Sequence, residues 1–200
     1  DKLGPLTLTA DDCGIALQSM AGYDPSDPST TKERFVYEDK ALSRKLRLGV
    51  IRDVAKDAQP PVRDNFAQSL KSLETIADIE EVTLQDLPYE SMSRTIINAE
   101  SASAFEELIE NGKIMELTDP SNRLGGYTRM FIPAVDYLKA LRIRGIAAEI
   151  VDKTMEGFDA WIAPSRPSVA PPIDRDFRGV FSPGGDIMGG VGNGLGLPSI

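Results

Sequence analysis

The stretch LRLGVIRDVAKDAQPPVRDNFAQSLKSLETIADIEEVTL, residues 46–84, decides the fold class of this chain. Residues 46–51 alternate apolar side chains with polar or small ones, a pattern that predicts a β-strand. Residues 79–84 predict a second strand. The helix between them begins at Pro60-Pro61, and its apolar face consists of Val62, Phe66, Leu70, Leu73 and Ile76. A strand, a helix and a strand within about forty residues form a βαβ unit, which predicts a parallel strand pair with a right-handed crossover and an α/β fold.

Further helices and one short strand are predicted on either side of this unit. Thr9 and Asp12 are typical of a helix start, because a hydroxyl can accept a first-turn N–H group and an acid favours the positive end of the helix dipole. Gly22 is a natural end for that helix. The other predicted elements are a helix over 93–109, a loop over 120–127, a long helix from Pro133 to about Gly157 and a buried strand over 158–163.

The last part of the chain has a different composition. Six of the 14 prolines and eight of the 17 glycines lie between Pro164 and Pro198. This predicts a tail dominated by loops, which in a compact domain are more often functional than idle. The glycines from Gly184 to Gly196 lack the G-x-G-x-x-G pattern between a strand and a helix and the Gly-Lys-Ser/Thr ending of a phosphate-binding loop. They favour a backbone that passes close to another surface or to a ligand.

Composition and charge exclude several classes of function. The 200 residues are 41% hydrophobic and 26% charged, as in an ordinary globular protein, and the net charge is −9. We expect no direct nucleic-acid binding, because an acidic chain without a basic cluster is poorly suited to phosphate contacts. No apolar run approaches the roughly 18 residues of a membrane helix. We therefore expect a cytoplasmic protein that does not bind membranes.

The catalytic side chains that are available are also limited. There is no histidine, and Cys13 is the only cysteine. The chain alone therefore builds no Ser-His-Asp triad, no Cys-His pair, and no histidine-ligated or cysteine-rich metal site. Neither a metal nor a cofactor is predicted.

Two arginines on the long helix, Arg142 and Arg144, point roughly 200° apart at about 100° per residue, so they cannot share one role. One interpretation is a surface arginine together with one that reaches past the edge of the core. The other is that one guanidinium holds a carboxylate or carbonyl group in a pocket. On a helical wheel Arg142 lies among Val135, Leu138 and Ile146 and is the residue that the wheel predicts to point inward.

Five segments, spaced across the whole chain, resemble motifs of the amidase signature family. They are DKLGPLT at 1–7, AGYDPSDP at 21–28, LRLGV at 46–50, FDAWIAPSRP at 158–167 and GNGLGLPSI at 192–200. The family patterns that they resemble are D-x-x-G-P, A-G-x-D-P-x-D-P, L-R-I-G-V, Y-D-V-L-L-T-P-T-x-P and G-N-L-A-G-L-P-A-I. The segments also follow one another in the order that the family has.

The resemblance implies a fold and an activity. The fold is an α/β/α sandwich around a mixed sheet, of which residues 1–200 would be a C-terminal portion with an incomplete core, no internal boundary and a loop-rich tail at 164–200. The activity is hydrolysis or transfer of amides by a serine, a bridging cis-serine and a lysine, without histidine. In the family these groups precede the D-x-x-G-P motif, so no residue of this chain is assigned a catalytic role and the chain alone is predicted to be inactive.

The resemblance also implies two substrate-binding residues. In the A subunits of tRNA-dependent amidotransferases, an arginine on the helix before the D-V-L-L-T-P strand binds the substrate carboxylate, and Arg144 falls on it. An aspartate seven residues before the asparagine of the last motif binds the substrate amine, and Asp186 falls there. We predict that Arg144 and Asp186 approach each other at the rim of one concave site, although the helical wheel favours Arg142.

Three functions stay open at this point. The first is the substrate-side portion of an amidase that acts on a small or aryl amide, and the second is an amidotransferase A subunit. The third is a non-catalytic binding module with the same fold. The expected partners are a small-molecule amide and either the remainder of the amidase domain or another copy of this chain, because a sheet with missing strands leaves an unpaired edge.

Overall fold

The computed structural model describes residues 4–28, 30–40, 43–174 and 185–199, and contacts group them into two units. The first unit lies within residues 4–44 and the second is Lys45–Ser199. The sequence predicted no internal boundary, whereas the contacts separate the chain just before its first strand. That the 200 residues belong to one amidase signature domain stays a prediction.

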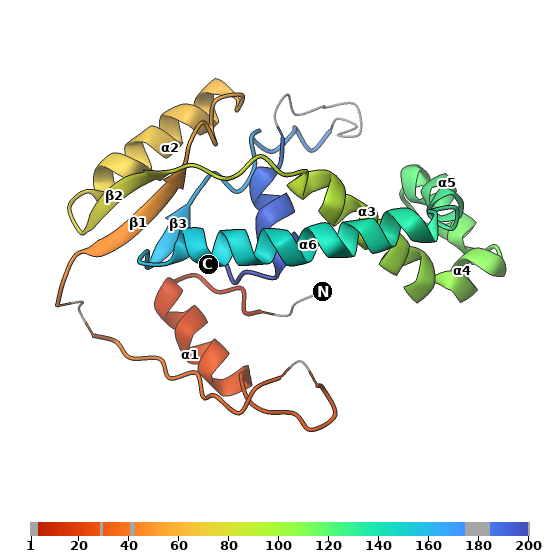
Figure 1. Cartoon of the computed structure of the whole chain (residues 1–200), viewed down its shortest axis with the longest axis horizontal. Coiled ribbons are helices and arrows are strands. Elements are labelled where there is room, and N and C mark those ends of the chain that lie inside the picture. Colours follow the sequence, from red (N-terminus) through yellow and green to blue (C-terminus); the bar gives the residue numbers. More distant parts are fainter. Residues whose placement is uncertain (1–3, 29, 41–42, 175–184, 200) are drawn as a thin grey trace. The chain divides into compact units, whose positions relative to one another are not determined.

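The first unit is built around helix α1 (Ala10–Met20), drawn in red in Figure 1. The predicted start is confirmed, because the Oγ1 atom of Thr9 accepts a hydrogen bond from the backbone N–H of Asp12 at 3.1 Å. Tyr37 packs its ring against Gly14, and its hydroxyl donates a 2.6 Å hydrogen bond to Asp11 Oδ1. That hydrogen bond is the main reason why the pKa of Tyr37 rises to about 12. Tyr37 therefore attaches its segment of the chain to α1 through its ring and its hydroxyl group.

The second unit contains the predicted βαβ unit (Figure 1). Strand β1 (Leu46–Ile51) pairs in parallel with β2 (Ala77–Val82) on one side and with β3 (Ala160–Ile162) on the other, in the order β2-β1-β3. Strand β2 begins two residues before its predicted start. The α/β class is confirmed. All strands of the described residues are parallel, so the mixed sheet and the complete sandwich stay implications of the resemblance.

Helix α2 (Pro60–Leu73) connects β1 to β2, with Pro60 at its first turn as predicted. Val62, Phe66 and Leu73 are partly buried on its apolar face. Ile76, which the periodicity assigned to the same face, lies beyond the end of the helix and is 55% exposed.

The remaining helices depart from the sequence prediction in two places. The helix predicted over 93–109 is two helices, α3 (Tyr89–Ala104) and α4 (Glu106–Glu110), which break at Phe105. The loop predicted over 120–127 is a helix, α5 (Pro120–Arg129), which follows the short 3₁₀ turn η1 (Lys113–Glu116). Asp119 caps α5 by accepting the N–H of Ser121 at 2.9 Å, and Pro120 takes the first position, where its missing N–H is not needed.

Gly126 lies where α5 contacts η1. A side chain on Gly126 would overlap Ile114, because an added Cβ would lie 1.9 Å from its Cδ1 atom. The glycine therefore allows α5 to approach η1 closely, and packing outweighs its low helix propensity.

Helix α6 (Ala134–Met155) carries a buried stripe of small residues, Ala140, Ala147 and Val151. The apolar residues that the helical wheel placed inward, Val135, Leu138 and Ile146, are instead 68%, 49% and 53% exposed. The choice of Arg142 as the inward arginine is therefore wrong, since Arg142 is exposed on that same side.

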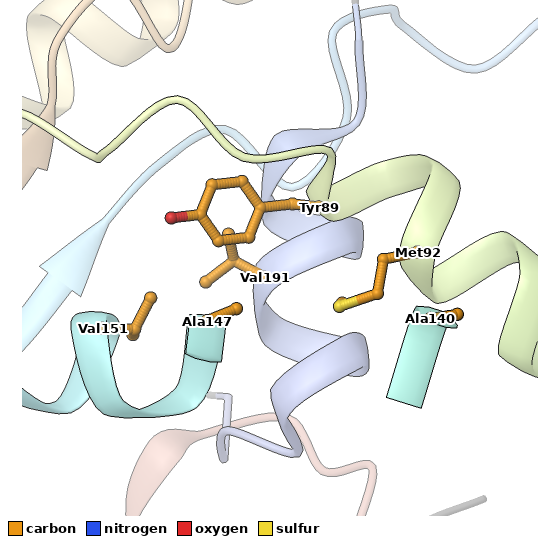
Figure 2. Packing of buried hydrophobic residues seen from close by; sticks show 6 residues of the cluster. All are labelled: Tyr89, Met92, Ala140, Ala147, Val151 and Val191. Atoms are coloured by element: carbon orange, nitrogen blue, oxygen red, sulfur yellow. The ribbon is translucent and has the colours of Figure 1, made fainter. Parts of the chain in front are cut away.

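The core of the second unit joins α3, α6 and the end of the chain (Figure 2). Residues 187–195 are helical and include the π-helix η3 (Gly189–Asn193), so the tail is not composed of loops alone. Val191 of η3 packs among Tyr89 and Met92 of α3 and the alanines of α6. A Cβ on Gly190 would lie 2.9 Å from the backbone nitrogen of Glu90, so this glycine does pass close to another surface, as predicted.

No helix of the described residues is long and apolar enough to cross a membrane.

Gly49 offers a test of the sheet packing. An added Cβ would lie 2.6 Å from Trp161 Cδ1 and 2.8 Å from Val82 Cγ2. We expect Gly49→Ala to lower the free energy of unfolding by about 1–3 kcal/mol, because the ring and the strand must shift to make room. Urea denaturation followed by the fluorescence of Trp161, the only tryptophan, measures this change.

The matched control is Gly145→Ala in α6, where an added Cβ meets nothing within 4 Å. That change should leave stability unchanged or raise it by up to about 1 kcal/mol. Equal effects of the two substitutions would contradict the described packing of Trp161 on β1.

Candidate functional site

A groove of about 990 Å³ lies where β3 ends, between α2 and the segment 162–171, and we call it the α2 groove. Ligands of open α/β sheets bind at the carboxyl ends of parallel strands, so this is the expected place for a site. The groove is lined by Pro61, Val62, Asn65, Phe66, Ser69, Ile162, Ala163, Pro164, Ser165, Arg166, Ser168, Val169, Ala170 and Pro171.

Gln59 holds the turn that forms one wall of the α2 groove. Its backbone N–H donates to the carbonyl oxygen of Pro167 at 2.8 Å, and its side-chain Oε1 accepts the N–H of Val169 at 3.1 Å. Gln59 stands just before α2 but makes no capping bond to that helix with its side chain. The sequence analysis missed this residue, and a glutamine that precedes Pro-Pro is only a weak signal for such a role.

Asp186 starts the helical segment 187–195. Its Oδ1 accepts the backbone N–H of Gly189 at 2.8 Å, and its carbonyl oxygen accepts the N–H of Gly190 at 2.9 Å. The other carboxylate oxygen, Oδ2, accepts a hydrogen bond from Nη1 of Arg166 at 3.2 Å. Asp186 therefore combines a helix cap with an ion pair to the arginine that lines the α2 groove.

Arg144 lies in a different polar group, on α6 beside Tyr137. The Tyr137 hydroxyl donates a hydrogen bond to Glu100 of α3, and this bond is the main cause that raises the pKa of Tyr137. The positive charge of Arg144 acts in the opposite direction and lowers that pKa. The exposed Arg144 thus belongs to a charged group that bridges α3 and α6.

A second groove, of about 600 Å³, lies between α3 and the start of α6. It contains charged residues of both signs, including Arg94, Asp136 and Lys139. Neither Arg144 nor Asp186 lines this groove or the α2 groove. Among the described residues, the ion-pair partner of Asp186 is Arg166, and the predicted approach of Arg144 to Asp186 stays a prediction.

Residues 4–28, 30–40, 43–174 and 185–199 contain no group of three or more acidic, cysteine or histidine residues that could hold a metal ion.

Comparison with known proteins identifies a family. The family model described as Amidase matches residues 1–182. The glutamyl-tRNA(Gln) amidotransferase A subunit of Pseudomonas savastanoi pv. phaseolicola is 25% identical over 203 residues, which cover 94% of this chain and 40% of that protein. The corresponding A subunit of Pseudomonas fluorescens strain Pf0-1 is 27% identical over 198 residues, 85% of this chain and 41% of that protein. The chain thus spans about two fifths of the length of these relatives.

Solved structures share the fold. The glutamyl-tRNA(Gln) amidotransferase A subunit of Thermotoga maritima matches with a TM-score of 0.71 at 22% identity, over 98% of this chain and 44% of that one. A bacterial aryl acylamidase of the amidase signature enzymes matches with a TM-score of 0.64 at 16% identity, over 81% and 36%. A vestigial protein complex linked to the origins of an s-triazine catabolic enzyme matches with a TM-score of 0.73 at 24% identity, over 86% and 38%.

Removal of the Gln59 side chain tests how the groove wall is held. In Gln59→Ala, we expect the amide of Val169 to exchange with solvent about five- to tenfold faster, because it loses its acceptor, at a cost in stability of about 1 kcal/mol. Hydrogen exchange followed by NMR measures both effects. Gln68→Ala, a change of the same type on exposed surface of α2, is the control. Unchanged exchange at Val169 in Gln59→Ala would rule out this role.

Proposed function

Because the chain belongs to the amidase signature family, we propose that it is the substrate-side portion of an amidase-type hydrolase that cleaves the C–N bond of a carboxylic amide. The observation that carries this proposal is that residues 162–166 of the family-like motif FDAWIAPSRP form a wall of the α2 groove at the end of β3. The motif by which the chain resembles amidases thus contributes to a candidate ligand site.

The proposed chemistry follows from the family resemblance. A serine oxygen attacks the amide carbonyl, and its proton passes through the cis-serine and lysine to the departing nitrogen as the C–N bond breaks. Water then cleaves the acyl ester, which returns the serine and releases a carboxylic acid. We propose that these catalytic groups lie before the D-x-x-G-P motif, outside this chain.

Arg144 and Asp186 remain the proposed substrate-binding residues. A guanidinium suits a carboxylate or carbonyl oxygen, and a carboxylate suits an amine or an amide N–H. The hydrogen bonds that Asp186 makes with Arg166 and Gly189 already use both of its carboxylate oxygens. A substrate amine would therefore have to displace Arg166 or share the carboxylate with it.

A second candidate is the A subunit of a tRNA-dependent amidotransferase. It is favoured by the relatives, which are named as A subunits of glutamyl-tRNA(Gln) amidotransferase. Because those relatives are named as subunits, we propose that this chain also associates with other chain segments, either the remainder of the amidase domain or another copy. We propose a cytoplasmic location as well, since the relatives are named for tRNA chemistry.

The proposal that the catalytic groups lie outside this chain can be tested directly. We expect the 200-residue chain to release no ammonia from benzamide or butyramide and to react with no serine-directed fluorophosphonate, because no serine here matches the family's catalytic signature. A protein that carries the family's serine, cis-serine and lysine segment before residue 1 should do both. Stoichiometric labelling of the isolated chain, with turnover, would overturn the expectation. An inactive completed protein would favour the non-catalytic binding module.

Arg144 is tested in the same completed protein with two amides of equal length, succinamate and neutral butyramide. Arg144→Ala should raise KM for succinamate by about tenfold or more and leave butyramide nearly unchanged, since only succinamate carries a carboxylate. Arg142→Ala, two positions along the same helix, is the control and should change neither value. Equal losses on both amides would argue against carboxylate binding by Arg144.

A further inference from the structure

We propose that the α2 groove binds the acyl part of an amide that carries an apolar group and a carbonyl or carboxylate oxygen, and that Arg166 makes it reject an ammonium group. Arg166 is thus assigned as a specificity-determining residue. That the ligand is a substrate rests on the proposed function, whereas its chemical class follows from the groove itself.

The walls of the α2 groove are largely apolar. Helix α2 contributes Val62 and Phe66, and the end of β3 contributes Ile162 and Ala163. All four are partly buried, so their remaining exposed surface faces a concave space. Such a lining with a few polar groups is typical of small-molecule sites, in which apolar contact supplies affinity and the polar groups fix orientation.

Arg166 is the one charged residue in the lining of the α2 groove as the structure describes it. Its partner Asp186 does not line the groove and holds Nη1 at 3.2 Å. A guanidinium has five N–H donors in a fixed plane, so one bond to Asp186 leaves donors for a ligand oxygen. Among the described residues, an ammonium group in the same groove would meet the guanidinium and no lining carboxylate.

Arg166 is also held from two sides, which prepares it for binding. Gln59 bonds to the backbone of Pro167 and Val169, just after the arginine in the chain. Asp186 holds the guanidinium and is itself fixed by the N–H of Gly189 at the start of a helical segment. The two side chains of the ion pair are 69% and 41% exposed, so the pair contributes little to stability. The bond to Asp186 favours one orientation of the guanidinium, and a group that is already oriented loses less entropy on binding.

Binding of three probes of matched length to the 200-residue chain tests the proposal. The probes are 3-phenylpropanoate, 3-phenylpropanamide and 3-phenylpropylammonium, and NMR titration follows the amide signals of residues 162–171. We expect the carboxylate and amide probes to bind in the groove and the ammonium probe to bind at least about tenfold more weakly than the carboxylate.

Two variants separate the charge from the apolar wall. Arg166→Gln should bring the three affinities to within about threefold of one another, with a smaller loss of affinity for the neutral amide than for the carboxylate. Phe66→Ala should weaken all three probes by a similar factor and preserve their order. Arg63→Gln, which removes an arginine from the same helix outside the groove lining, is the control and should behave as the unchanged chain. Circular dichroism confirms that each variant is folded.

Several results would overturn the proposal. One is that no probe perturbs the amide signals of residues 162–171. Another is that the ammonium probe binds as tightly as the carboxylate probe. A third is that the preference for the carboxylate over the ammonium probe persists in Arg166→Gln. Self-association of the chain in sedimentation, accompanied by loss of probe binding as the chain associates, would also overturn it. The result of the binding experiment does not depend on whether the protein hydrolyses an amide. A completed protein that hydrolyses no amide refutes the proposed function alone, and failed probe binding beside normal turnover refutes this inference alone.

Discussion

The close approach of three helical segments through small residues is the constraint on which the second unit depends. Ala140 and Ala147 of α6 and Gly190 of η3 have almost no side chain at their contacts, so η3 can pack with both α3 and α6 (Figure 2). Protein interiors are packed as densely as organic crystals, so a larger side chain at Gly190 would meet the backbone of α3 rather than a flexible neighbour. The position of η3 is therefore determined by backbone contact.

The candidate site follows from that packing. Once η3 is in place, the segment that begins it carries Asp186, and Asp186 reaches Arg166 in the turn after β3. The same turn is bonded to Gln59 at the start of α2, which belongs to the βαβ unit. One arginine is thus positioned both by the core and by the sheet. A groove lined mostly by apolar residues acquires a single oriented positive charge in a chain whose net charge is −9.

The sequence predicted the parts of the fold that are governed by local pattern. The β1-α2-β2 unit, the cap at Thr9 and the length of α6 all follow from periodicity and terminal residues. It could not predict which side of α6 is buried, because that helix is apolar almost all round and the packing selects its smallest residues. The helical turns over 187–195 were missed because glycine disfavours helices unless tertiary contact requires it. The Arg166–Asp186 pair joins residues that are 20 positions apart in the sequence, and no local pattern reveals such a contact.

The residues that carry the family resemblance differ from the arginine that we propose as the determinant of ligand choice. The fold is shared with solved structures at 16–24% identity, and a shared fold hosts many substrates. The one charged side chain in the described lining of the α2 groove stands in an irregular turn, where sequence can change without disturbing the sheet. The guanidinium of Arg166, which is bonded to Asp186, determines the charge that a ligand meets and requires no change in β3 or α2. In the proposal made here, the charge of this turn selects the ligand, and a guanidinium beside apolar side chains favours a carboxylate or carbonyl oxygen over an ammonium group.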